Sequence, residues 1–104
     1  MNLCEFGTLL AGAYPNSYHS RAGVQDGNYL VWREYGGARQ RSGPLEVRKI
    51  QVDLFTRTEF DPALEVIAAA LTAAGVAFQA PKTSYEPETG YIHHILLCEV
   101  LDRT

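Results

Sequence analysis

Two adjacent histidines, His93 and His94, come nearest to a metal site by residue type and spacing. Imidazole nitrogens are common zinc ligands, but neighbouring side chains on a strand point to opposite faces and cannot easily bind one ion. A third ligand would have to come from His19, Glu86 or Glu88, and the spacing of these residues does not favour it. We therefore expect no metal and no other cofactor, with one histidine packed and the other exposed or at an interface.

Glu86 and Glu88 could perform general acid–base catalysis if their surroundings gave the two carboxyl groups different acidities. They flank a proline in the turn-rich segment 80–90, where water should surround both. No serine lies in a nucleophile-elbow motif, and Cys4 has no evident base partner. The glycines do not form a phosphate-binding loop. We therefore expect no catalytic residue and no enzymatic activity.

The composition and net charge narrow the functional classes to which the protein could belong. The chain has 104 residues, 46% of them apolar and 20% charged, with a net charge of −3, which is typical of one folded domain over residues 1–104. A nucleic-acid-binding domain would carry a basic excess, so we expect no sequence-specific nucleic-acid partner. No apolar run approaches the ~20 residues that span a bilayer, and no secretion signal is evident. We therefore expect no membrane partner and a cytoplasmic location.

The two cysteines, Cys4 and Cys98, belong to no CxxC pair. In a reducing cytoplasm such residues are expected to be small, buried apolar side chains. The sequence does not decide whether they form a disulfide.

The clearest element is a helix over Asp61–Gly75. Asp61 can cap the first turn, Pro62 suits the first helical position, and Gly75 can adopt the left-handed conformation that ends a helix. Phe60, just before the cap, is placed to act as a hydrophobic staple. A shorter helix over residues 3–11 is predicted from the capping-box pattern of its first residues.

The helix over 61–75 is apolar around most of its circumference, and such a helix is usually buried on more than one side. The final strand also carries apolar residues on both faces, which is more than one small core requires. We therefore predict that part of this surface is a subunit interface. The predicted interface residues are Val66, Ala69, Ala70, Ala73, Ile95 and Leu97.

Aromatic and β-branched residues predict long strands over Tyr29–Tyr35, Leu45–Thr56 and Tyr91–Leu101. Residues 13–18 are predicted as an irregular or edge strand and Val76–Gln79 as a short one. Polar and glycine-rich segments between these elements are predicted as loops, among them 36–44 and 80–90.

The long strand Leu45–Thr56 contains a change of pattern. Ile50, Val52 and Leu54 alternate with polar residues, whereas Val47 has the opposite parity. We predict a bulge or a change of partner near Arg48–Lys49.

Only one predicted helix lies between strands, so the chain lacks the regular alternation of a parallel α/β sheet. The order of elements predicts an α+β fold. Its sheet should be mixed and largely antiparallel, with four to five strands, and the two helices should pack on one face.

The loop Gly36–Pro44 carries Arg39 and Arg41, and Arg48 and Lys49 follow it. This basic patch on an acidic protein could be a solvated hairpin tip. Alternatively, if the protein forms a ring, symmetry would multiply the patch into a positive band facing a lumen or a partner.

The assembled pattern resembles the small tail-completion, or tail-terminator, proteins of long-tailed bacteriophages. The resemblance covers most of the chain and lies in the order of elements, because none of the motifs is a catalytic signature. The matching segments are YLVW (Tyr29–Trp32), IQVDLFT (Ile50–Thr56), DPALEVIAAAL (Asp61–Leu71), the helix end at Gly75 and SYEPETGYIHH (Ser84–His94).

The resemblance implies a virion structural protein, located in the virion tail and assembled in the host cytoplasm. Such proteins form a ring of identical copies, commonly a hexamer, which ends the tail tube and offers a surface to the head. The implied partners are further copies, the tail tube protein and a head-completion or connector protein, with no cofactor. Arg39, Arg41 and Arg48 are then candidates for the loop that faces the lumen or a partner.

Two readings from other classes remain. One is a small α+β ligand-binding domain or enzyme with an aromatic-lined pocket, which would show convergent polar groups. The other is an antitoxin-like or adaptor protein, which a basic partner-binding groove would favour. The pocket of the first would be lined by Tyr29, Trp32, Tyr85, Tyr91 and His93.

Overall fold

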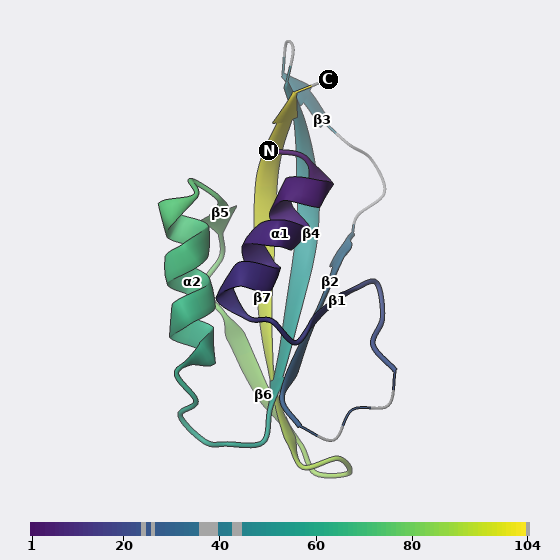
Figure 1. Ribbon diagram of the computed structural model, residues 1–104, viewed down its shortest axis with the longest axis vertical. Helices are drawn as coiled ribbons and strands as arrows, with labels where there is room; N and C mark the ends of the chain where they lie inside the picture. Colours follow the sequence, from purple (N-terminus) through teal and green to yellow (C-terminus); the bar gives the residue numbers. More distant parts are fainter. Residues whose placement is uncertain (24, 26, 36–39, 43–44, 104) are drawn as a thin grey trace.

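The computed structural model of the protein describes residues 1–23, 25, 27–35, 40–42 and 45–103. Within these residues the chain forms two helices and a seven-stranded sheet (Figure 1). In chain order the elements are α1 (Leu3–Ala13), β1 (Ser17–His19), β2 (Tyr29–Glu34), β3 (Gln40–Ser42), β4 (Leu45–Thr56), α2 (Ala63–Ala73), β5 (Ala77–Phe78), β6 (Lys82–Glu86) and β7 (Tyr91–Arg103).

The sheet is mixed and largely antiparallel. Its order is β1-β2-β4-β7-β5, with β3 paired to β4 and β6 paired to β7, and only the β1–β2 pair is parallel among the described strands. The α+β class and the placement of both helices on one face are confirmed (Figure 1). The predicted count of four to five strands is too low, because β3 and β6 lie in segments predicted as loops.

The long pair of β4 and β7 runs without interruption from Leu45 opposite Arg103 to Thr56 opposite Ile92. The bulge is therefore absent from this described ladder. On the other edge of β4 the partner changes instead, from β2 at Ile50 to β3 at Val47. Of the two alternatives predicted near Arg48–Lys49, the change of partner is correct.

The core lies between the helices and one face of the sheet. Fully buried side chains from both helices, among them Phe6 and Ile67, meet alternate residues of the central strands. These strand residues share one parity, so the opposite parity defines a second face that neither described helix covers. The core residues are Phe6, Leu10, Leu30, Trp32, Ile50, Val52, Leu54, Ile67, Leu71, Val76, Leu96, Cys98 and Val100.

The start of α1 is fixed by hydrogen bonds among its first residues. The Asn2 side chain accepts a hydrogen bond from the Glu5 N–H at 2.8 Å, and the Glu5 carboxylate accepts one from the Asn2 N–H at 3.0 Å, so the predicted capping box is present. The helix continues two residues beyond the predicted end at residue 11. The terminal amine of Met1 donates to the Leu101 carbonyl at 2.8 Å, which joins this end of the chain to β7.

Gly7 allows α1 to approach Trp32, because a Cβ at this position would lie 2.8 Å from the indole Cζ2 atom. The indole cannot easily move, since it stacks on His19 and makes an edge contact with Phe6. We expect Gly7→Ala to lower the free energy of unfolding by about 1–3 kcal/mol through overpacking, reduced somewhat by the better helix propensity of alanine.

Gly12, also in α1, is the matched control, because a Cβ there meets nothing within 4 Å. Gly12→Ala should raise the free energy of unfolding by about 0.5–1 kcal/mol through helix propensity alone. Urea unfolding of both variants measures the difference. A rise in the free energy of unfolding for Gly7→Ala, as for Gly12→Ala, would contradict the close packing described for Gly7.

Candidate interaction surfaces

The outer face of α2 carries exposed apolar residues beside two exposed polar ones, Glu65 and Thr72. Ile67 and Leu71 pack toward the sheet, whereas Val66, Ala69 and Ala73 point away from it. Val66 is 50% exposed and Ala70 is partly buried at the margin of this stripe. We call Val66, Ala69 and Ala73 the α2 face. These residues leave an uncharged stripe along the helix with no described partner in this chain.

The ends of α2 follow the predicted capping chemistry in part. The Asp61 carboxylate accepts a hydrogen bond from the Ala63 N–H at 2.8 Å, and Gly75 has the predicted left-handed conformation, with φ of 76°. The hydrophobic staple is wrong, because Phe60 is 93% exposed. Phe60 itself has a positive φ of 57°, which is uncommon for a residue with a side chain.

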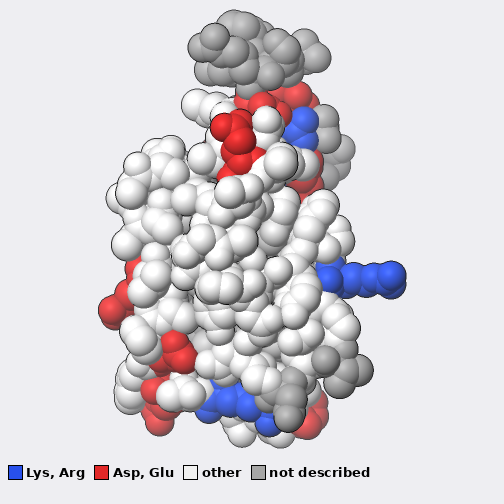
Figure 2. Space-filling model, viewed as in Figure 1, with Lys and Arg blue, Asp and Glu red and all other residues white. Residues whose placement is uncertain are grey.

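The uncharged surface extends beyond α2. Figure 2 shows that the middle of the helix-bearing face, over α1 and α2, is almost free of charged side chains among the described residues. The charged groups gather toward the ends and margins of this face. Within this uncharged area, Val66 is an exposed large apolar side chain, and exposed apolar areas are typical of interaction surfaces.

The second face of the sheet mixes apolar and polar pairs across β4 and β7. Ile95 lies opposite Asp53 and Leu97 lies opposite Gln51, and both apolar side chains are half-buried. Leu101, on the same face, is 54% exposed. The two predicted interface residues of β7 are thus on the face that neither described helix covers.

An aromatic cluster with a buried carboxylate occupies the end of this second face. His93 Nε2 lies 2.8 Å from Asp53 Oδ1, and its ring stacks on Phe55, which in turn stacks on Tyr29. The other nitrogen of His93 lies 3.5 Å from the Glu86 carboxylate. Within the described residues, therefore, both ring nitrogens face carboxylates.

Ser84, His93 and Asp53 are the residue types of a catalytic triad. Ser84 lies opposite His93 in the β6–β7 ladder, and Asp53 contacts the His93 ring. A serine nucleophile needs a histidine nitrogen to accept its proton. Both nitrogens of His93 lie close to the carboxylates of Asp53 and Glu86 instead. Ser84, His93 and Asp53 therefore do not form a catalytic triad.

The two histidines point to opposite faces, as the strand period predicts. His94 lies on the helix-bearing face, where its Nδ1 is 2.9 Å from the Thr83 hydroxyl oxygen. Both histidines are half-buried and hydrogen-bonded, so neither is fully exposed, and a place for one of them at an interface stays a prediction. The described residues contain no group of three or more possible ligands for a metal ion.

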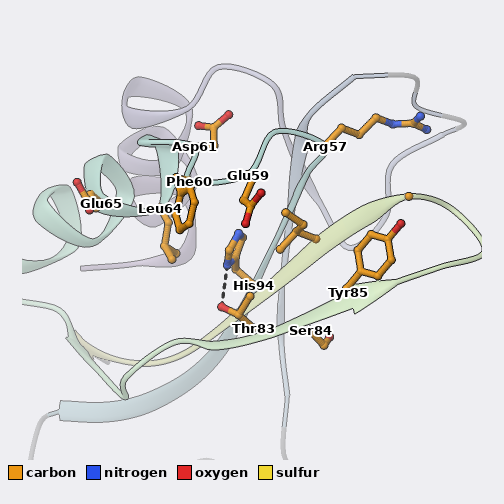
Figure 3. Close-up of a pocket in the computed structure, with 12 residues that line it drawn as sticks. Arg57, Glu59, Phe60, Asp61, Leu64, Glu65, Thr83, Ser84, Tyr85 and His94 are labelled. Carbon is orange, nitrogen blue, oxygen red and sulfur yellow. Dashed lines mark hydrogen bonds between the residues drawn. The ribbon is translucent and has the colours of Figure 1, made fainter.

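His94 lies in a groove of about 780 Å³ between the start of α2, the segment before it and the β6–β7 hairpin (Figure 3). Asp61 and Glu65 lie on the helix side of this groove, and Glu59 lies on the segment before α2, beside His94 in Figure 3. Arg57 lies near the hairpin. The Asp61 carboxylate is already occupied by the Ala63 N–H and the Asn28 amide. The other lining residues are Phe60, Leu64, Thr83, Ser84, Tyr85, Gly90 and Ile92.

Burial lowers the pKa of His94 below its usual 6.5, and the neighbouring His93 lowers it further, while Asp61 acts in the opposite direction. The unfolded chain therefore binds a proton below about pH 6.5 that the folded protein binds less readily. The stabilisation by neutral His94 is complete above this pH and is lost as the pH falls below it.

We expect the free energy of unfolding to decrease between pH 7 and pH 5, and His94→Gln to reduce the slope because glutamine does not titrate. Urea unfolding at several pH values measures both curves. An unchanged slope in the variant would show that other groups cause the dependence.

The predicted basic patch is only partly described. Arg39 lies outside the described residues, and Arg41 belongs to β3 opposite Glu46, with its side chain outside the description. Arg48 lies on β4 between two carboxylates, 2.8 Å from Glu34 and 2.9 Å from Asp102. A lumen-facing role for these three arginines stays a prediction.

The aromatic pocket of the alternative reading is not formed. Tyr29, Tyr91 and His93 come together on the second face, whereas Trp32 packs under α1 and Tyr85 lines the groove on the helix-bearing face. The five residues therefore lie on two sides of the sheet.

The described cysteines are both free. Cys98 is buried, as predicted, and burial raises the pKa of its thiol to about 12. Cys4 is exposed, which corrects the prediction for this residue. Neither described helix is long and apolar enough to cross a membrane.

No protein-family model matches this sequence, and no curated protein matches it. The fold is similar to that of a chain in a solved structure described as the virion of a native gene transfer agent particle. The TM-score is 0.57, and the match covers 91% of this chain and 84% of the other at 15% sequence identity. At this identity the two chains share a fold.

Proposed function

We propose that this protein is a structural component of a phage or phage-like virion. The fold is shared over most of its length with a chain of a gene transfer agent virion. The uncharged α2 face is the observation that carries the proposal, because exposed apolar residues grouped along one helix are typical of a surface that contacts another subunit. The contacts of His93 with the carboxylates of Asp53 and Glu86, and the capping role of Asp61, also favour a non-enzymatic protein.

More specifically, we propose a tail terminator, or tail-completion protein, that acts as a ring. Copies would contact one another through the α2 face and through Ile95 and Leu97 on the second face. The ring would dock on the last layer of the tail tube, block further addition and present a surface to the head. The resemblance in the order of elements supports this role.

The test is assembly with a purified tail tube protein. Light scattering over a range of concentrations should show a mass of several subunits, at least when the tube protein is present, and polymerised tubes should stop lengthening. A protein that stays monomeric with the tube protein and does not affect tube length would contradict the ring.

The loop of residues 36–44 provides a second test. In the proposed ring, Arg39 and Arg41 face the lumen or a partner, so the variant Arg39→Glu/Arg41→Glu should reduce tail joining while the far-ultraviolet circular dichroism spectrum stays unchanged. Particle yield from a complementation assay measures joining. An unchanged yield would remove these arginines from the contact.

A further inference from the structure

β6 forms an open edge of the sheet. Among the described strands it pairs with β7 alone, and four of its five residues are exposed. Tyr85 is 63% exposed, although tyrosine usually buries much of its ring. Unpaired backbone groups on an exposed edge are a template for another strand, and β6 lies at the margin of the sheet in Figure 1.

The sequence of this edge is symmetric in charge and in shape. It reads Pro81-Lys82-Thr83-Ser84-Tyr85-Glu86-Pro87, with opposite charges at equal distances from Ser84 and a proline beyond each. Proline has no N–H to donate, so Pro81 and Pro87 limit any added ladder to the five residues between them.

We propose that β6 pairs antiparallel with β6 of a second copy of this chain, about a two-fold axis at Ser84. In this register Lys82 lies opposite Glu86 of the partner subunit, and the same pair recurs at the other end. Thr83 lies opposite Tyr85 of the partner subunit, and Ser84 meets its own symmetry mate. Opposite charges at facing positions stabilise an antiparallel pair, whereas like charges oppose it.

The charged groups are available for this contact. Lys82 is exposed and has no ion-pair partner among the described residues. The Glu86 carboxylate accepts a hydrogen bond from the Thr89 hydroxyl at 3.1 Å and lies 3.5 Å from His93, but it is 30% exposed and retains free acceptor sites. A lysine from a second copy can therefore reach it.

Other registers are worse. A shift of two residues brings Pro81 or Pro87 into the ladder and separates the charged pairs. A shift of one residue turns the second copy over, so that its helices lie on the other side of the joined sheet. In the register centred on Ser84, the helices of both copies lie on one side. Tyr85 of the partner subunit then lies over Thr83, at the edge of the groove that contains His94.

This contact is isologous and uses the edge of the sheet, whereas a closed ring needs heterologous contacts. It is therefore independent of the α2 face and of the proposed ring. It would pair two free subunits, or two subunits of different rings, edge to edge.

The first test is a cysteine at the symmetry axis. Directly opposite residues of an antiparallel pair have Cα atoms about 4.5–5.5 Å apart, which suits a disulfide. In a Cys4→Ala background Cys98 is buried and unreactive, so Ser84→Cys should form a disulfide-linked dimer under mild oxidation. Thr58→Cys, at another exposed position, is the control. Equal cross-linking of the two variants would overturn the proposal.

The second test exchanges the charges. In sedimentation equilibrium, Lys82→Glu and Glu86→Lys should each weaken dimerisation on the order of tenfold, because each creates two like-charged pairs. The double variant Lys82→Glu/Glu86→Lys should restore it. If none of the three variants changed the dimerisation constant, or if Ala69→Arg abolished the dimer instead, the contact would lie elsewhere and the proposal would be overturned. So would a wild-type chain that stays monomeric at millimolar concentration.

Discussion

Ala69→Arg should abolish ring assembly and leave the subunit folded. Ala69 is exposed at the centre of the α2 face, so an arginine there points into water in the free subunit and changes its free energy of unfolding by less than about 0.5 kcal/mol. In a packed interface the same side chain would bury an unpaired charge, which costs roughly 3–5 kcal/mol. We therefore expect association to weaken by at least about a hundredfold.

Thr58→Arg is the matched control, because it adds the same charge at an exposed position outside α2. Light scattering with the tube protein measures assembly, and urea unfolding measures the stability of the subunit. Full assembly by Ala69→Arg would remove α2 from the interface. Equal loss in both variants would indicate a general effect of charge.

Arg48→Ala should cause the largest loss of subunit stability among the polar substitutions. The guanidinium lies between the carboxylates of Glu34 and Asp102, and the exposed fraction of its side chain is 15%. Its removal would leave two negative groups close together in a largely desolvated place. Breaking a buried ion pair costs about 3–5 kcal/mol, and partial exposure here reduces the expected loss to about 2–4 kcal/mol.

Two further variants make this result specific. Arg33→Ala removes an exposed arginine from β2 and should change the free energy of unfolding by less than about 0.5 kcal/mol. Arg48→Lys keeps the charge but cannot bridge two carboxylates with a planar group, so its loss should be intermediate. The midpoints of urea unfolding compare the stabilities of Arg48→Ala, Arg48→Lys and Arg33→Ala. A loss for Arg48→Ala no larger than for Arg33→Ala would show that the ion pairs contribute nothing measurable.

Much of the fold could be predicted because local patterns were strong. The bounds of β4 follow from alternation and β-branched residues, and the first helix follows from the capping box of Asn2 and Glu5. β3 and β6 were predicted as loops because glycine and proline flank them and neither has an apolar alternation. Each becomes a strand only by pairing with a long neighbour, and local propensity does not report such partners.

The position of Phe60 depends on contacts from a distant part of the chain. Asn28 donates to the Asp61 carboxylate at 3.0 Å and accepts a hydrogen bond from the Arg57 N–H at 2.8 Å. These bonds hold both ends of the segment before α2, and Phe60 between them takes a left-handed conformation and points outward. The staple pattern is local, so it could not include this restraint.

The candidate surfaces were predictable in part for the same reason. The apolar circumference of α2 is visible in the sequence, and Val66, Ala69 and Ala73 are exposed, whereas their role in a subunit interface stays a prediction. The supposed pocket failed on simple periodicity, since Tyr29 and Trp32 are three apart on one strand and must face opposite sides. The symmetry of charges and prolines around Ser84 is present in the sequence, but it becomes meaningful only when β6 is known to be a strand.

The central place of β7 has a consequence for how the protein is made. β7 follows every other described strand in the chain, yet it joins β4 on one side to β5 and β6 on the other. Until residues 91–103 leave the ribosome, β4 has an unpaired edge and the strands beyond it have no partner. Such long-range pairing is slow to form. The sheet therefore cannot be completed before residues 91–103 have been synthesised, and chaperones would meet the earlier strands with the edge of β4 still unpaired.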